Sequence, residues 1–118
     1  MSENIGIELK KNVKDTQNIT ILIRDYVNSL IADKSDDKII ENAKFAEKFC
    51  LATLYLSIAR YEVYLNKDQF IQSIEDDFVK ANNYFKEIDD ELNKKSDDDQ
   101  KEIINILDKY THMYKLTV

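Results

Sequence analysis

Apolar residues recur through most of this chain at intervals of three and four, which is the repeat of an amphipathic helix. The first such seam lies within residues 4–33. Its members are Leu9, Val13, Thr16, Thr20, Ile23, Val27 and Leu30. The β-branched stretch between Ile19 and Ile23 would suit a strand in isolation, but the helical seam continues through it. We therefore predict one long helix here, with the turns around Gly6 the least regular.

Three more helices are predicted by the same repeat, over residues 36–65, 69–93 and 97–116. A residue that favours the N-cap position precedes each of them: Ser35, Asp68 and Ser96. The third helix has the most regular seam, formed by Ile71, Ile74, Phe78, Ala81, Phe85, Ile88 and Leu92. The fourth presents a face formed by Ile103, Leu107, Tyr110 and Tyr114.

The links between these helices are short, and short links place neighbouring helices antiparallel. Proline is absent and Gly6 is the only glycine, so the chain lacks the residues that tight turns in sheet proteins require. With 118 residues the chain has the length of one domain. The predicted fold is all-α: a single domain over residues 1–118, formed by an antiparallel bundle of four long helices.

The second predicted helix is more hydrophobic than a bundle helix needs to be. Residues 49–59 contain no charge, and three apolar seams run along the helix. The first is Phe45, Phe49, Ala52, Leu56, Ala59 and Val63. The second is Leu51, Leu54, Ile58, Tyr61 and Leu65. The third contains small residues: Ala43, Ala46, Cys50, Thr53 and Ser57. We expect this helix, residues 36–65, to be the most buried of the four.

Three partner helices in a regular bundle would leave part of that apolar surface uncovered. Either an irregular monomer wraps around the helix, or a second chain covers one seam. We favour a covered seam, either in a homodimer or against a protein partner. The candidate interface residues are Leu51, Leu54, Tyr55, Ile58, Tyr61 and Leu65.

Charge and cysteine content limit the remaining possibilities. The net charge is −6, and lysines are interleaved with acids, so direct binding to nucleic acid or to an anionic membrane surface is not expected. A single cysteine, Cys50, excludes an internal disulfide and suits the cytoplasm. No signal peptide and no transmembrane run are recognised in the sequence.

No residue pattern predicts catalysis, a cofactor or a metal. The one histidine, His112, falls off the predicted apolar face and has Lys109 three positions before it, so the Glu-x-x-His motif of di-iron bundles is missing. Cys50 lies among small apolar residues, where it serves as packing. Two of the four runs of aspartates, Asp36–Asp37 and Asp97–Asp99, stand at predicted helix starts, where they act as caps. We therefore predict a protein that is not an enzyme.

The favoured function is a small acidic module for protein–protein interaction, acting through the apolar surface of the second helix. Two alternatives stay open. One is an acidic inhibitor or decoy of a basic nucleic-acid-binding protein, which requires a continuous negative face. The other is a bundle that holds a small molecule in an enclosed cavity lined by tyrosines.

Overall fold

The computed structural model describes residues 2–67 and 69–116, together with the side chains of residues 4–67 and 69–112. Within those residues the chain forms four helices: α1 (Ser2–Ala32), α2 (Asp37–Leu65), α3 (Gln72–Leu92) and α4 (Asp97–Leu116). The prediction of an all-α bundle of four long helices is confirmed. Asp68 and the side chain of Tyr114, both used in the prediction, lie outside the described residues.

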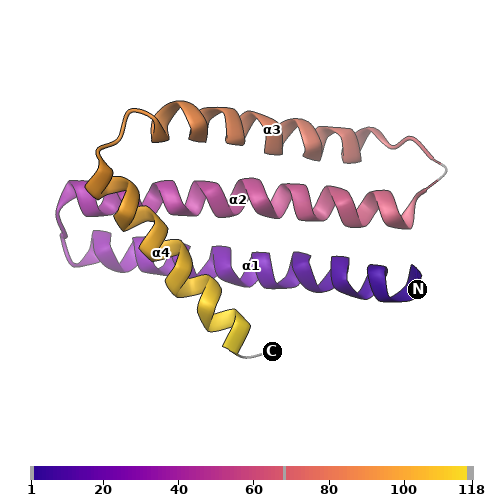
Figure 1. The fold of residues 1–118 in the computed structure, drawn as a ribbon, viewed down its shortest axis with the longest axis horizontal. Helices are drawn as coiled ribbons and strands as arrows, with labels where there is room; N and C mark the ends of the chain where they lie inside the picture. Colours follow the sequence, from indigo (N-terminus) through magenta and orange to yellow (C-terminus); the bar gives the residue numbers. More distant parts are fainter. Residues whose placement is uncertain (1, 68, 117–118) are drawn as a thin grey trace.

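The first three helices run antiparallel in one layer, with α2 between α1 and α3 (Figure 1). The fourth helix does not join that layer. It starts beside the end of α3, crosses α2 obliquely and continues over α1. Because α2 packs against all three other helices, it has more buried residues than any of them, as predicted. They are Asn42, Ala43, Phe45, Ala46, Cys50, Ala52 and Ala59.

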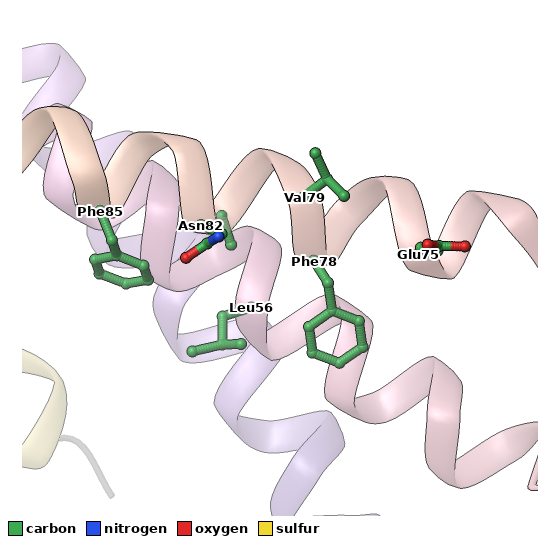
Figure 2. A pocket seen from close by; sticks show the side chains of 7 residues that line it. Leu56, Glu75, Phe78, Val79, Asn82 and Phe85 are labelled. Carbon is green, nitrogen blue, oxygen red and sulfur yellow. The ribbon is translucent and has the colours of Figure 1, made fainter.

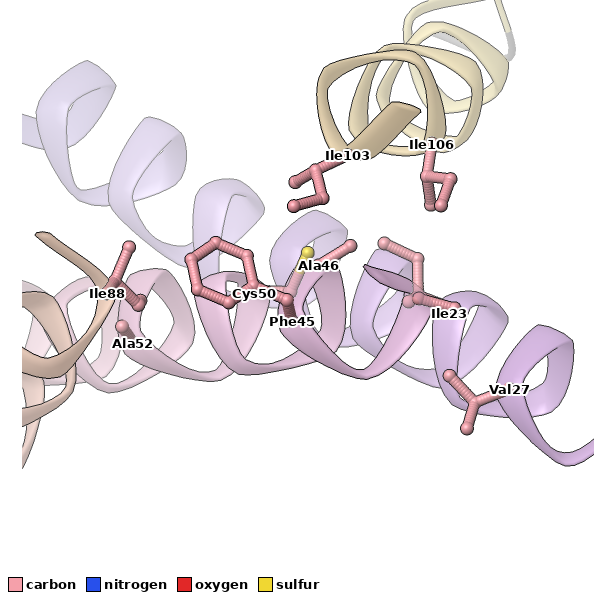
Figure 3. Close-up of a cluster of buried hydrophobic side chains, with 10 residues drawn as sticks. Ile23, Val27, Phe45, Ala46, Cys50, Ala52, Ile88, Ile103 and Ile106 are labelled. Atoms are coloured by element: carbon pink, nitrogen blue, oxygen red, sulfur yellow. The ribbon is translucent and has the colours of Figure 1, made fainter. Parts of the chain in front are cut away.

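The main core lies where α4 crosses the layer (Figure 3). Ile103 and Ile106 point from α4 toward α2 and α1. They meet Ile23 of α1 and the small side chains Ala46 and Cys50 of α2. Small residues allow a crossing helix to approach closely, so this stripe of α2 suits the oblique contact. Farther along α4, the rings of Tyr26 and Tyr110 pack 5.9 Å apart.

A buried polar contact fixes α4 on α2. The side chain of Asn42 is 1% exposed. Its Nδ2 donates to Asp99 Oδ1 and to Glu102 Oε2, each at 3.1 Å. Lys38 Nζ lies 3.4 Å from Asp99 Oδ2. The hydrogen bond from Asn42 is the main reason that the pKa of Asp99 is lowered, with Ser96 and Lys38 adding to the effect. Glu102 follows Asp99 at a spacing of three positions, which places both carboxylates on one face of α4.

The start of α2 corrects one prediction, because the N-cap is Asp36 and not Ser35. Lys38 N–H donates to Asp36 Oδ1 at 3.2 Å. The backbone N–H of Ser35 instead donates to Leu30 O at 3.0 Å and closes the end of α1. Lys34 N–H donates to Ile31 O, and Lys34 has a φ of 54°. This is a Schellman motif with lysine at the position that usually holds glycine, and it moves the start of α2 by one residue.

The start of α3 corrects a second prediction, since the helix begins at Gln72 rather than at residue 69. Gln69 N–H still donates to Asn66 O in the turn that follows α2. The N-cap is Ile71, which has an extended backbone and no side-chain cap. By contrast, α4 begins at Asp97 as predicted, with Ser96 Oγ accepting from Asp99 N–H at 3.2 Å. Gln100 of α4 also donates to Leu92 O and Lys95 O, which satisfies the end of α3.

Candidate interaction surface

The structure does not bring the six predicted interface residues together as one exposed patch. Five of them are half-buried: Leu51, Leu54, Tyr55, Ile58 and Tyr61. Only Leu65 is well exposed, at 58%. Four of them, Tyr55, Tyr61, Leu65 and Leu51, lie in three different surroundings.

One of the three surroundings is the contact with α3, where Tyr55 stacks on Tyr84 with 5.9 Å between ring centroids. The second is the contact with α1, where Tyr61 and Leu65 line a shallow hollow that also includes Gly6. The third is the side of α2 away from α4. Leu51 lies nine residues after Asn42, which is about 180° around a helix.

The larger apolar hollow lies elsewhere, in a groove between α2 and α3 (Figure 2). Its volume is about 390 Å³. Phe78 and Phe85 point from α3 toward α2, and Leu56 lies between their rings. Val79 and Glu75 stand along the α3 side, and Asn82 and Ala81 complete the lining.

A second hollow of about 230 Å³ extends the groove toward the turn between α2 and α3, and it shares Glu75 and Phe78 with the first. Its apolar members include Val63 and Phe70. Several groove side chains are unusually open for their size: Phe70 is 77% exposed, Val79 50% and Val63 45%. We call the two hollows together the α2–α3 groove.

The α2 wall of this groove belongs to the first apolar seam, not to the second seam that we selected from the sequence. Phe49, Leu56 and Val63 are seven residues apart, so they lie on nearly one line along α2. The ring of Phe49 meets Phe85 edge-on at 6.1 Å. Phe70 lies beyond the end of α2, in the turn before α3, so the signal in the sequence for this side of the helix was the seven-residue spacing of Phe49, Leu56 and Val63 alone.

The charged residues of α3 differ in their partners. Lys48 Nζ lies 2.8 Å from Glu87 Oε2 and 3.3 Å from Glu91 Oε1, and the hydrogen bond to Glu87 is the largest reason that the pKa of Lys48 is raised. Glu75, in contrast, lines the α2–α3 groove and has no bonding partner among the described residues. An unpaired carboxylate therefore stands beside an exposed apolar surface.

The two residues with potential chemistry lie apart from the groove. Cys50 is buried in the main core, and burial is the main cause that raises the pKa of its thiol to about 12. His112 is exposed on α4. Within residues 4–67 and 69–112, no group of three or more His, Cys, Asp or Glu side chains is arranged to hold a metal ion.

Among the helices in the described part of the chain, none combines the length and the apolar content that crossing a bilayer requires. No protein-family model matches the chain, and no match is found among the curated proteins or the solved structures. A function must therefore be argued from the α2–α3 groove and the charges around it.

Proposed function

We propose that this protein is a helical module for protein–protein interaction and that its docking surface is the α2–α3 groove. The observation that carries the proposal is the exposure of phenylalanine and valine side chains along this groove. Single exposed apolar residues are common on protein surfaces, but a contiguous set marks an interaction site more often than chance.

The lining of the groove supports this proposal over a small-molecule site. A ligand-binding bundle was expected to enclose a cavity lined by tyrosines. The larger hollow is lined by phenylalanine, leucine, valine and alanine, with Glu75 and Asn82, and exposed residues such as Val79 stand at its edge. An elongated apolar strip with polar residues at its margin resembles the centre and rim of protein interfaces.

The proposal includes two kinds of occupant, a second copy of the chain and a different protein. Both bury apolar surface, and each Å² removed from water contributes about 25 cal/mol. The homodimer expected from the sequence stays a prediction. The sequence-derived candidates Tyr61 and Leu65, which line the hollow against α1, stay an alternative location for the same function.

Site-specific photo-crosslinking in cells that express the protein naturally tests the proposal. A benzophenone amino acid replaces Val79 in the groove, and the matched control replaces Ile21 of α1, which is almost equally exposed at 48%. We expect light-dependent crosslinked protein from position 79 and not from position 21. A product of twice the chain mass identifies self-association, and any other mass identifies a different partner.

A third crosslinker position separates the two candidate surfaces. Replacing Leu65 places the probe on the α1 side of α2, among the residues selected from the sequence. Crosslinks from position 65 but not from 79 would move the docking surface to that side. If none of the three positions gives a product above background, the interaction function is wrong.

A further inference from the structure

One wall of the α2–α3 groove comes from α3, the most acidic of the four helices. The sequence of α3 contains seven acids and two lysines, a net charge of −5, whereas the whole chain has −6. In α1 and α2 the charges cancel, with four acids and four bases in each. Helix α4 has five acids and three lysines, a net charge of −2, so α3 holds more of the acidity than any other helix, and α3 forms a groove wall.

Much of this charge is not neutralised within the fold. Lys48 pairs with Glu87 and Glu91. The side chains of Glu75, Asp77, Asp89 and Asp90 have no hydrogen bond or ion pair among the described residues. Of these, Glu75 lines both hollows of the groove. A ligand in the groove would contact apolar side chains in the centre and the Glu75 carboxylate on the α3 side, while Lys67 lines the end of the second hollow.

The shape of the groove suits a helix. Phe49 and Val63 are fourteen residues apart on α2, which corresponds to about 21 Å of helix. Phe49 and Leu56 also lie within about 40° of Asn42 around α2, so they are on the side that α4 covers near Asn42. Beyond the point where α4 crosses α2 on its oblique path to α1, no described helix lies over this side of α2 (Figure 1).

We infer that the groove binds a basic amphipathic helix from a protein partner. This inference rests on the proposed function. The partner helix presents apolar side chains at intervals of three and four to Leu56, Phe78 and Val79, and lysines or arginines toward the acids of α3. This is the helix-in-groove mode of recognition. A second copy is disfavoured, because a symmetric contact through this groove would place two helices of net charge −5 together.

Binding of three synthetic peptides to the full-length protein tests the inference. The first is an eighteen-residue helix-forming peptide with leucines along one face of the helix and lysines on its remaining faces. The second replaces every lysine by glutamate and keeps the leucines. The third keeps the composition of the first but scatters the leucines so that no apolar face forms. Affinities are measured by fluorescence anisotropy, and the bound surface is mapped by amide chemical shifts.

We expect the basic amphipathic peptide to bind at least tenfold more tightly than either of the others, with shift changes centred on Leu56, Phe78 and Val79. Because six of the seven acids of α3 are solvent-exposed, raising the salt from 0.05 M to 0.5 M should weaken binding by roughly threefold or more. Equal binding of the first and third peptides would overturn the inference, since charge alone would then explain it.

Surface variants separate the apolar contribution from the charged one. Val79→Ser should weaken binding by roughly tenfold, because a half-exposed apolar anchor is lost, and Glu75→Lys should weaken it by a similar factor through charge reversal. The matched controls are Ile21→Ser and Asp25→Lys on α1, which should leave the affinity within twofold. Circular dichroism confirms that each variant is folded. The chemical-shift map of the wild-type protein locates the binding surface without relying on any variant.

Failure of this inference is distinguishable from failure of the proposed function. Crosslinks from position 79 without any preference for the basic peptide would leave an interaction module whose partner is not a basic helix. A crosslinked product of twice the chain mass, together with peptide affinities that differ less than tenfold, would show that the groove binds a second copy. Either result overturns the basic-helix inference.

Discussion

The second half of α2 is more apolar in sequence than the first, since six of the eight charged residues of the helix precede residue 49, yet the first half is the more buried one. In the first half α1, α3 and α4 enclose the helix, and its buried residues extend from Asn42 to Ala52. In the second half only Ala59 is buried, and Val63 and Leu65 are among the exposed apolar residues. The difference teaches that an apolar helix is not buried by its own composition but by the path of the helix that crosses it.

The side of α2 that faces α4 explains why the crossing occurs where it does. On this side Ala46 is small, and Asn42 donates to two carboxylates of α4. The same side continues at spacings of three and four to Leu56 and Arg60, which are larger and offer no matched partner on α4. Close approach and a specific polar contact are both available only in the first half.

Removal of a core side chain in the enclosed half should have the largest effect on stability. Ile23 is fully buried against α2 and α4, and Ile23→Ala should lower the free energy of unfolding by about 2–5 kcal/mol. The control is Ile21→Ala, a change of the same residue type at a site that is 48% exposed, with an expected change of about 0.5 kcal/mol or less. Urea unfolding measures both changes in the free energy of unfolding. Equal losses would show that the enclosed half is not the stable core.

Loss of the buried amide should have the second largest effect. Asn42→Ala leaves Asp99 and Glu102 without their shared donor and should cost about 2 kcal/mol. Asn83→Ala, on the exposed surface of α3, is the control and should be neutral. If the two substitutions have the same effect, the polar contact does not fix α4 on α2.

Acidification should weaken the same contact. Because hydrogen bonds lower the pKa of Asp99 in the folded state, its contribution to stability is present above the ordinary aspartate value and is lost as the pH falls through the lowered one. Asp99→Asn, which keeps an oxygen to accept from Asn42, should lose less stability than the wild type in that acid range. Asp98→Asn is the control and should follow the wild-type curve in urea titrations at each pH.

The turn that leads into the enclosed half contains a strained residue. Lys34 has a φ of 54° at the end of α1, a conformation that costs L-residues roughly 1–2 kcal/mol and glycine little. After the greater unfolded-state entropy of glycine is subtracted, Lys34→Gly should raise stability by about 0.5–1 kcal/mol. Lys94→Gly, in the turn before α4, should not raise the midpoint of thermal unfolding. An increase of equal size at residue 94 would show that the gain at residue 34 does not come from relief of strain.

The smallest effect is expected at the open end, where the ring of Tyr64 packs against Gly6. A Cβ added at residue 6 would lie 2.7 Å from Tyr64 Cε1. The helix-forming preference of alanine over glycine, about 1 kcal/mol, is therefore offset by displacement of the ring, and Gly6→Ala should change stability by about 0.5 kcal/mol or less. In a Tyr64→Ala background the same substitution should be stabilising. If Gly6→Ala is stabilising in both backgrounds, the Tyr64 ring does not oppose a side chain at residue 6.

The sequence by itself determined the local structure of this protein. Spacings of three and four, with no proline and one glycine, specified four long helices, because hydrogen bonds within a helix and the side chains on one face depend on neighbours in the chain. Ser96 identified the start of α4 for the same reason. The one-residue and three-residue shifts at α2 and α3 arose where turn hydrogen bonds competed with side-chain caps.

Only the tertiary structure decided which apolar seam is covered. All three seams of α2 can be recognised in the sequence, and we selected the one that contains Leu54 and Ile58. Both of these residues are half-buried in the fold. Leu56 of the first seam is also half-buried, but it lines the α2–α3 groove together with the exposed Val63, because α4 crosses obliquely toward α1 and does not follow this line of α2. Burial of a side chain depends on where a distant segment crosses, and that position is a property of packing among all four helices rather than of any one of them.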